Sequence, residues 1–210
     1  MKFKSIIDGL TEGGSYRHAL FYNFPGGLRF ELSEGESPLD QVLTALRKAT
    51  EICNDVFNDG DSVLVHLQRF VFSTRFELRR SIRELAMAGI SIAKDRDVWY
   101  EKVEESDDFG EGLWINCAFK VPAAKLQNLL WCALVTDFSS MHPNPHCLIY
   151  FVNPASAIIV HPYDDRGMDV IGRKPAVLEA LYKKRNHWLL DYDREAMEQT
   201  FAPKKTGASL

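Results

Sequence analysis

The chain has 210 residues, of which 46% are hydrophobic and 26% are charged. This composition excludes a disordered protein, because a chain of this size buries enough apolar surface to fold without disulfides or metals. Lysine and arginine number 25 against 29 aspartate and glutamate residues, so the net charge of −4 argues against a dedicated nucleic-acid binder with a basic face.

The beginning of the chain carries no secretory signal, because Met1 to Leu10 places its apolar residues at helical spacing with charged residues between them. The longest apolar run, Leu129 to Val135, is too short to cross a bilayer. We therefore expect a cytoplasmic protein without a membrane segment. No CxxC pair occurs, and the cysteines lie in apolar stretches typical of buried, reduced thiols. They are Cys53, Cys117, Cys132 and Cys147.

Two strands are predicted next, Tyr16 to Phe24 and Leu28 to Leu32, on either side of a Pro-Gly-Gly turn. In the second strand apolar residues alternate with Arg29 and Glu31, so these two charged side chains share one face. Ser37 then predicts the N-cap of a long helix, with a proline at its first position.

The middle of the chain predicts further alternating elements. They are a strand over 62–72, a helix from the capping-box spacing at Thr74 to Gly89, a strand over 97–103, an acidic loop from Glu104 to Gly112, a half-buried strand over 113–121, and a helix from Pro122. Two prolines make 141–146 a loop, which excludes a zinc site from the H-x-x-x-H spacing of His142 and His146, since that spacing requires a helix.

The last third predicts a buried strand over 147–152 and then a hairpin, with strands over 157–163 and 168–171. Gly167 is expected to supply a positive φ in the hairpin loop. A long helix begins at Pro175, Asp193 is expected to cap a short one, and 203–210 is expected to be a disordered tail. Strands in runs with helices between them predict an α+β fold. We expect one domain over 1–202, with a largely antiparallel sheet and four or five packed helices.

Three stretches carry a resemblance to a known family. They are FYNFPGGLRFEL from Phe21, YDDRGMDVIG from Tyr163 and HWLLDYDR from His187. Over nearly the whole chain the sequence resembles the bacterial domain of unknown function 3885 family, and the DDRG-x-D segment is the most specific part. The resemblance implies a bacterial source and a single domain, but no activity or substrate. Some members of the family lie near toxin and toxin-immunity genes.

The strongest candidate site is the cluster Asp164, Asp165, Arg166 and Asp169, with His161 upstream. Three carboxylates within six residues suit Mg²⁺ or Ca²⁺, and an aspartate also suits general-base chemistry, although the calcium-loop spacing is missing. The structural alternative is a polar hairpin tip in which Arg166 pairs with Asp169.

Arg29 and Glu31 complete the predicted binding residues, although a solvated or cross-strand ion pair explains them as well. Arg79, Arg80 and Arg83 form a basic stripe on the helix predicted after Thr74 and are expected to be its solvated face.

Two functional hypotheses follow. Nucleotide-binding, zinc-protease and serine-hydrolase motifs are missing, so we assign no catalytic residue, cofactor or metal ligand. We favour a non-catalytic protein-binding module, in its most specific form a toxin-immunity protein that covers a bacterial toxin with an acidic surface. The alternative is a metal-dependent hydrolase or nuclease centred on Asp164, Asp165 and Asp169.

Overall fold

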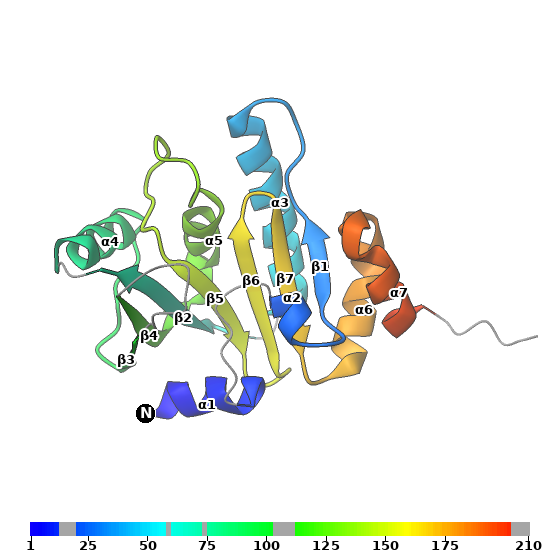
Figure 1. Cartoon of the computed structure of the whole chain (residues 1–210), viewed down its shortest axis with the longest axis horizontal. Coiled ribbons are helices and arrows are strands. Elements are labelled where there is room, and N and C mark those ends of the chain that lie inside the picture. Colours follow the sequence, from blue (N-terminus) through cyan, green and yellow to red (C-terminus); the bar gives the residue numbers. More distant parts are fainter. Residues whose placement is uncertain (13–19, 58–59, 73–74, 103–111, 203–210) are drawn as a thin grey trace, which may run out of the picture.

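The computed structural model describes residues 1–12, 20–57, 60–72, 75–102 and 112–202 (Figure 1). The strands are β1 (Leu28–Glu31), β2 (Ser62–Val71), β3 (Arg96–Lys102), β4 (Leu113–Pro122), β5 (Leu148–Asn153), β6 (Ile158–Asp164) and β7 (Gly167–Gly172). The α-helices are α1 (Lys2–Thr11), α2 (Leu20–Asn23), α3 (Pro38–Val56), α4 (Arg75–Met87), α5 (Leu126–Leu134), α6 (Pro175–Arg185) and α7 (Arg194–Phe201).

All strands join one antiparallel sheet in the order β1-β7-β6-β5-β2-β4-β3. The predicted α+β class, the antiparallel sheet and the single domain are confirmed. The described residues form seven α-helices rather than four or five, because the short helices α2 and α7 join the longer ones. Among the described residues, no helix combines the length and apolar character needed to cross a bilayer.

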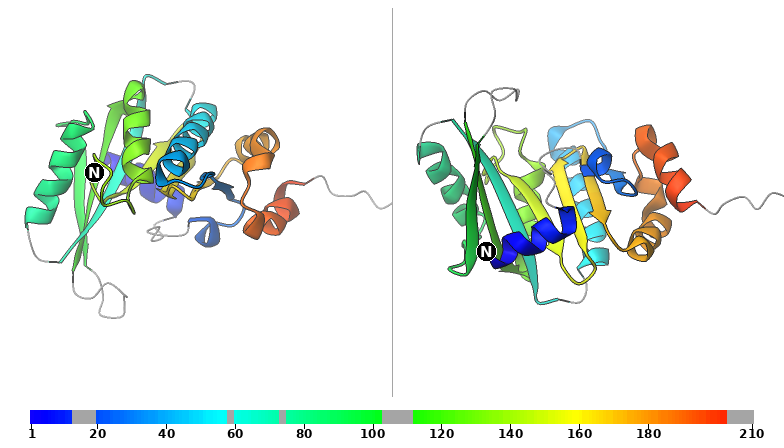
Figure 2. Two further views of the ribbon diagram at one scale, coloured as in Figure 1. Left: turned by 90° about the horizontal axis from the view of Figure 1, so that it is seen from above. Right: turned by 60° about the horizontal axis from the view of Figure 1, so that its bottom comes forward.

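Helices cover both faces of the sheet, because alternate residues of each strand point to opposite sides. On one face Val63, Val65 and Leu67 of β2 belong to a large core that also contains residues of α3 to α7. On the other face Leu64 belongs to a second core with Phe3 and Ile7 of α1 and residues of β5 and β6. Figure 2 shows α1 crossing the sheet on the side away from α3 and α5. Because helices cover both faces, polar residues at the centre of these strands, such as His66 and Asp169, are fully buried.

The predicted strand over Tyr16 to Phe24 is wrong where it can be tested. Leu20–Asn23 is the helical turn α2, while residues 16–19 lie outside the described residues. The aromatic residues of this segment favour a strand, but Leu20 is fully buried in the second core and its carbonyl accepts a bond from the Phe24 N–H at 2.9 Å. Tertiary packing therefore decides the local structure. The acidic stretch 103–111, the Thr74 cap and the tail 203–210 also lie outside the described residues.

Gly167 does not have the positive φ expected of it, because the hairpin loop consists only of Asp165 and Arg166, and Gly167 is already extended in β7. A glycine is required there for space. A Cβ at this position would lie 1.9 Å from the Tyr163 hydroxyl and 2.9 Å from the Phe30 carbonyl oxygen of β1. The residue therefore permits the close approach of three strands.

We expect Gly167→Ala to lower the free energy of unfolding by about 1 to 3 kcal/mol, because the backbone of β1 has to move away. Urea denaturation measures this loss. The matched control is Gly9→Ala in α1, where an added Cβ meets nothing within 4 Å. That change should be neutral or stabilise the protein by up to about 1 kcal/mol. Equal effects of the two substitutions would contradict the steric explanation.

Candidate functional site

The most specific polar arrangement is centred on Arg29 of β1. Its Nε donates to Asp169 Oδ1 at 2.7 Å and its Nη2 donates to Asp169 Oδ2 at 3.0 Å. Arg29 and Asp169 are register partners in β1 and β7, so the sheet itself places them opposite one another. The Asp169 side chain is fully buried, and Arg29 is 9% exposed. A buried, bidentate arginine–carboxylate ion pair has a fixed geometry and is little screened by salt.

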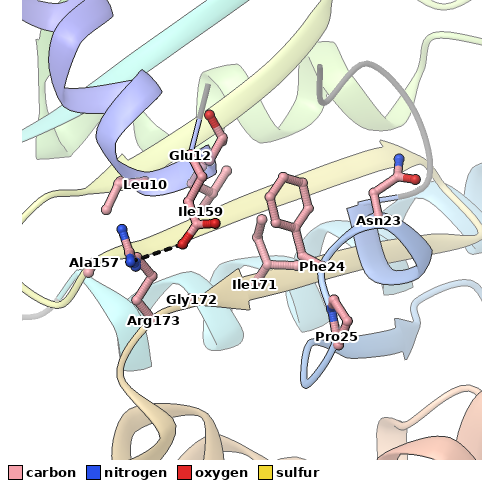
Figure 3. Close-up of a pocket in the computed structure, with 11 residues that line it drawn as sticks. Leu10, Glu12, Asn23, Phe24, Pro25, Ala157, Ile159, Ile171, Gly172 and Arg173 are labelled. Carbon is pink, nitrogen blue, oxygen red and sulfur yellow. Dashed lines mark hydrogen bonds and ion pairs between the residues drawn. The ribbon is translucent and has the colours of Figure 1, made fainter. Parts of the chain in front are cut away.

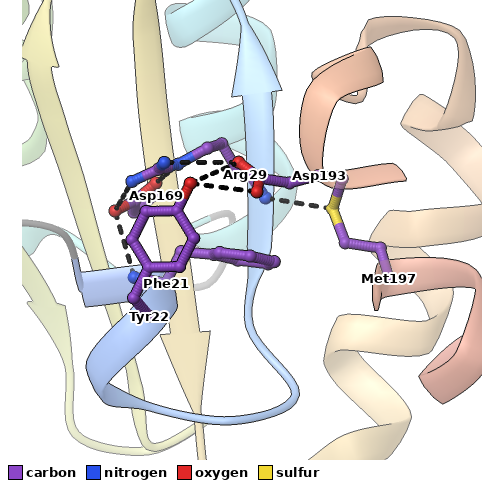
Figure 4. Close-up of polar contacts among 6 residues, drawn as sticks. All are labelled: Phe21, Tyr22, Arg29, Asp169, Asp193 and Met197. Atoms are coloured by element: carbon purple, nitrogen blue, oxygen red, sulfur yellow. Dashed lines mark hydrogen bonds and ion pairs between the residues drawn. The ribbon is translucent and has the colours of Figure 1, made fainter. Parts of the chain in front are cut away.

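A second carboxylate and a tyrosine extend this arrangement (Figure 4). Arg29 Nη1 donates to Asp193 Oδ2 at 3.3 Å, and the Tyr22 hydroxyl donates to Asp193 Oδ1 at 3.0 Å. The Phe21 N–H donates to Asp169 Oδ2 at 3.1 Å. We call Arg29, Asp169, Asp193 and Tyr22 the Arg29 network. It joins α2, β1, β7 and the 3₁₀ turn Asp191–Asp193, and its outermost members, Tyr22 and Asp193, are 171 residues apart in the sequence.

Aromatic rings surround the guanidinium of Arg29. Its central carbon lies 5.4 Å from the ring centroid of Phe21, 4.6 Å from that of Tyr22 and 5.5 Å from that of Tyr163. Burial opposes the charged form, but the hydrogen bonds and charge of Asp169 outweigh it and raise the pKa of Arg29. Burial and the charge of Asp169 raise the pKa of Tyr163. The Arg29 network therefore holds a permanent cation between carboxylates and neutral rings.

Asp193 was expected to cap the last helix, but its side chain makes no cap hydrogen bond to α7. It belongs to the Arg29 network instead. Glu31 lies two residues from Arg29, is exposed and does not pair with it, because Arg29 reaches across the sheet to β7. Arg29 and Glu31 therefore differ in their surroundings: Arg29 forms a buried ion pair with Asp169, while Glu31 is exposed.

The predicted pairing of Arg166 with Asp169 is wrong, because Asp169 is bonded to Arg29. Arg166 bonds to Asp164, with its N–H at 2.8 Å from Oδ1 and its Nε at 2.9 Å from Oδ2. Its Nη2 also contacts Asp164 and lies 3.3 Å from Asp137 Oδ2. Burial and then the neighbouring charge of Asp164 raise the pKa of Asp165. The hairpin tip is a compact acidic turn in which one arginine is shared by two aspartates.

The hairpin tip and the Arg29 network lie close together along the β1–β7 ladder. Glu31 is the register partner of Gly167, two residue pairs beyond Arg29 and Asp169, and the Leu32 N–H donates to the Arg166 carbonyl at 2.9 Å. Sequence analysis therefore selected residues from one region, although it assigned their contacts incorrectly.

Sequence analysis missed a buried row of polar and aromatic side chains under α1. The rings of His66, Tyr150 and His161 stack across three strands, with centroids 5.5 Å and 4.1 Å apart in that order. His66 Nε2 lies 3.0 Å from Asn116 Oδ1. The signal in the sequence is a single polar residue inside an apolar strand, as in Val65-His66-Leu67, which indicates burial on both faces.

The carboxylates at the hairpin do not converge as a metal site requires, because Asp164 is bonded to Arg166 and Asp169 to Arg29. In the ranges that the structure describes, no group of three or more His, Cys, Asp or Glu side chains is placed to hold a metal ion. The described cysteines are free, and burial raises the pKa of Cys147 and Cys117 to about 11, so these thiols are protonated at neutral pH.

A pocket of about 610 Å³ opens between the end of α1 and α2 (Figure 3). Ile159 and Ile171 of the sheet form part of its apolar wall, and an ion pair of 3.0 Å between Arg173 and Glu12 lies at one side. Both charged side chains of that pair are more than half exposed, so the ion pair adds little stability.

A protein-family model described as "Domain of unknown function (DUF3885)" matches residues 7–193, which is nearly the whole chain. No curated protein and no solved structure gives a significant match.

Proposed function

We propose that this chain, which belongs to the DUF3885 family, is a non-catalytic protein-binding module that binds through the surface above the Arg29 network and the adjoining acidic hairpin tip. The surface consists of the exposed residues Tyr22, Tyr192, Glu31, Asp137 and Arg166, and it adjoins Asp164 and Asp165 of the hairpin tip, which are only 4% and 5% exposed. Its acidic character and its tyrosines favour a basic partner surface.

The observation that carries the proposal is the exposure of Tyr22 and Tyr192, which are 56% and 86% exposed. The Tyr22 hydroxyl is nevertheless fixed by Asp193, which in turn is bonded to Arg29. A rigid, exposed tyrosine loses little conformational entropy when a partner covers it, and tyrosine is enriched among residues that dominate binding energy.

Charge supports the same surface. Glu31 and Asp137 are exposed carboxylates, while Asp164 and Asp165 at the end of the β6–β7 hairpin are nearly buried and only Asp164 and Asp137 contact the exposed guanidinium of Arg166. An excess of carboxylates accelerates association with a basic protein and selects against acidic ones. The Arg29 cation does not cancel this excess, because it is buried and bonded to its own two aspartates.

In its most specific form the proposal is that the partner is a bacterial toxin and that the chain is its immunity protein. The metal-dependent hydrolase is the weaker hypothesis, since the two aspartates it most needs are already bonded to arginines.

The test begins with capture of partners from a lysate of the source organism, followed by purification of each captured protein and calorimetry. We expect Tyr22→Ala to weaken binding by about 30-fold, which corresponds to a hot-spot residue. The matched control is Tyr100→Ala, because Tyr100 is 63% exposed on β3 at the far edge of the sheet. That change should leave the affinity unchanged.

A purified partner whose affinity is the same for wild type and Tyr22→Ala would place the interface elsewhere. The immunity form requires in addition that an equimolar amount of the chain inhibit the partner's toxic activity. A partner without toxic activity would overturn that form and leave the binding module in place.

A further inference from the structure

The pocket at the end of α1 has an apolar floor that the sheet provides (Figure 3). Ile159 of β6 and Ile171 of β7 are register partners, so their side chains lie next to each other on the face of the sheet that α1 covers. Leu10 of α1 and Phe24, which follows α2, are half-buried and continue the apolar lining. The volume of about 610 Å³ falls in the range of small-molecule sites, roughly 300 to 1,000 Å³.

Two opposite charges lie at one side of this pocket, and Phe24 lies at the other (Figure 3). Arg173 Nη1 donates to the Gly9 carbonyl in the last turn of α1 at 2.9 Å, and its Nη2 donates to Glu12 Oε1 at 3.0 Å. The backbone of Arg173 is also fixed, because its N–H donates to the Ala157 carbonyl at 3.1 Å. The guanidinium is therefore held at the pocket, where one of its nitrogens binds a carboxylate.

The ion pair between Arg173 and Glu12 is open to exchange with a ligand. The two side chains are 55% and 77% exposed, and an ion pair with this exposure contributes little to stability. A ligand that offers both a carboxylate and an ammonium group gives each of these side chains an opposite charge in place of the other. Such a ligand leaves neither protein charge without a partner.

We infer that this pocket binds a free α-amino acid with an apolar side chain. The ligand carboxylate accepts hydrogen bonds from Arg173, and the ligand ammonium group donates to Glu12. The ligand side chain packs on Ile159 and Ile171, next to the ring of Phe24. Charge-assisted hydrogen bonds fix the orientation of the ligand, while the apolar floor removes its side chain from water.

The short distance between the two protein charges selects the class of ligand. Arg173 Nη2 and Glu12 Oε1 are 3.0 Å apart, which suits a molecule whose ammonium and carboxylate groups are bonded to the same carbon. A fatty acid brings a carboxylate next to Glu12, and like charges repel. An end of a peptide carries one of the two charges and not the other. The free amino acid is the ligand that satisfies both charges and the apolar floor.

The experiment measures binding of phenylalanine to the full chain by calorimetry at low salt. Three related molecules each lack one feature of this ligand: hydrocinnamate lacks the ammonium group, phenethylamine lacks the carboxylate, and glycine lacks the side chain. We expect each of them to bind wild type at least about tenfold more weakly than phenylalanine, because each loses a charge-assisted contact or the burial of the ring.

Two variants assign the two charges of the ligand. Arg173→Gln and Glu12→Gln should each weaken phenylalanine binding by about tenfold or more. Glu12→Gln should bind hydrocinnamate at least as tightly as wild type does, because the repelling carboxylate is gone, and Arg173→Gln should do the same for phenethylamine. The matched control is Lys183→Gln, which removes the charge of another exposed ion pair, on α6, and should change the affinity by less than about twofold.

The melting temperature of each variant without ligand checks the fold, and it should change by no more than about 4 °C because the ion pair is exposed. If Arg173→Gln lowers it further, because α1 loses the bond to Gly9, Glu12→Gln alone decides. The inference is overturned if phenylalanine does not bind, or if Glu12→Gln binds it like wild type. It is also overturned if hydrocinnamate, phenethylamine or glycine binds wild type as tightly as phenylalanine does.

Discussion

Replacement of Arg29 by methionine is expected to lower the free energy of unfolding by about 3 to 5 kcal/mol, because it leaves a buried carboxylate without its partner. Asp169 is fully buried and, of the hydrogen bonds among described residues, would retain the Phe21 N–H at 3.1 Å. Asp193 would lose the Arg29 contact at the same time. Urea denaturation gives this loss as a lower midpoint at an unchanged slope.

Two further variants separate the ionic contact from simple packing. Asp169→Asn should cost less than Arg29→Met, because Arg29 keeps its contact with Asp193. The double variant Arg29→Met with Asp169→Leu should recover much of the loss, since a buried ion pair can be replaced by apolar side chains of similar size. If Arg29→Met lowered the free energy of unfolding by less than about 1 kcal/mol, the ion pair would be solvated rather than buried away from water.

The elements that the sequence predicted correctly are those decided by short-range chemistry. The α3 helix begins where Ser37 and Pro38 require it, and the Ser37 hydroxyl accepts the Asp40 N–H at 3.2 Å. The β4 strand follows from the uninterrupted alternation between Leu113 and Val121. Caps and alternation involve neighbours within about four residues, so one sequence contains all the information that they need.

The contacts of the candidate site could not be predicted in the same way. Arg29 and Asp169 are 140 residues apart, and Arg29 and Asp193 are 164 apart. Local reasoning paired Arg166 with the nearest remaining aspartate and assigned Asp193 to a helix cap. Both assignments fail because the register of β1 with β7 provides a better partner, and a single sequence does not determine that register.

The sequence nonetheless contained one indication of the ion pair between Arg29 and Asp169. Arg29 and Asp169 each stand alone among apolar residues, in Leu28-Arg29-Phe30 and Met168-Asp169-Val170. Alternation was interpreted as a solvated charged face, but the charge is buried because α2 packs against β7. Two isolated opposite charges in two strands covered on both sides indicate a cross-strand ion pair, since neither charge is stable there alone.

His66 carries the second large expected effect, which is a loss of stability in acid. The side chain is fully buried between Trp99 and Tyr150, with ring centroids at 4.8 Å and 5.5 Å. Burial lowers the pKa of His66 to about 3, from 6.5 for a solvated histidine, although the hydrogen bond with Asn116 acts in the opposite direction. The folded protein therefore keeps this ring neutral at a pH where the unfolded chain has protonated it.

The lower pKa of His66 in the folded state means that acid destabilises the protein. Because the pKa of His66 is lower in the folded state, its contribution is complete above pH 6.5 and is lost as the pH falls toward 3. The full loss is on the order of 5 kcal/mol, with a slope of about 1.4 kcal/mol per pH unit. Urea denaturation between pH 6.5 and 4.5 measures this slope before most carboxylates titrate.

His66→Gln should lower stability at every pH through lost ring stacking, and it should reduce the slope by about one proton. An unchanged slope in His66→Gln would assign the acid sensitivity to another group.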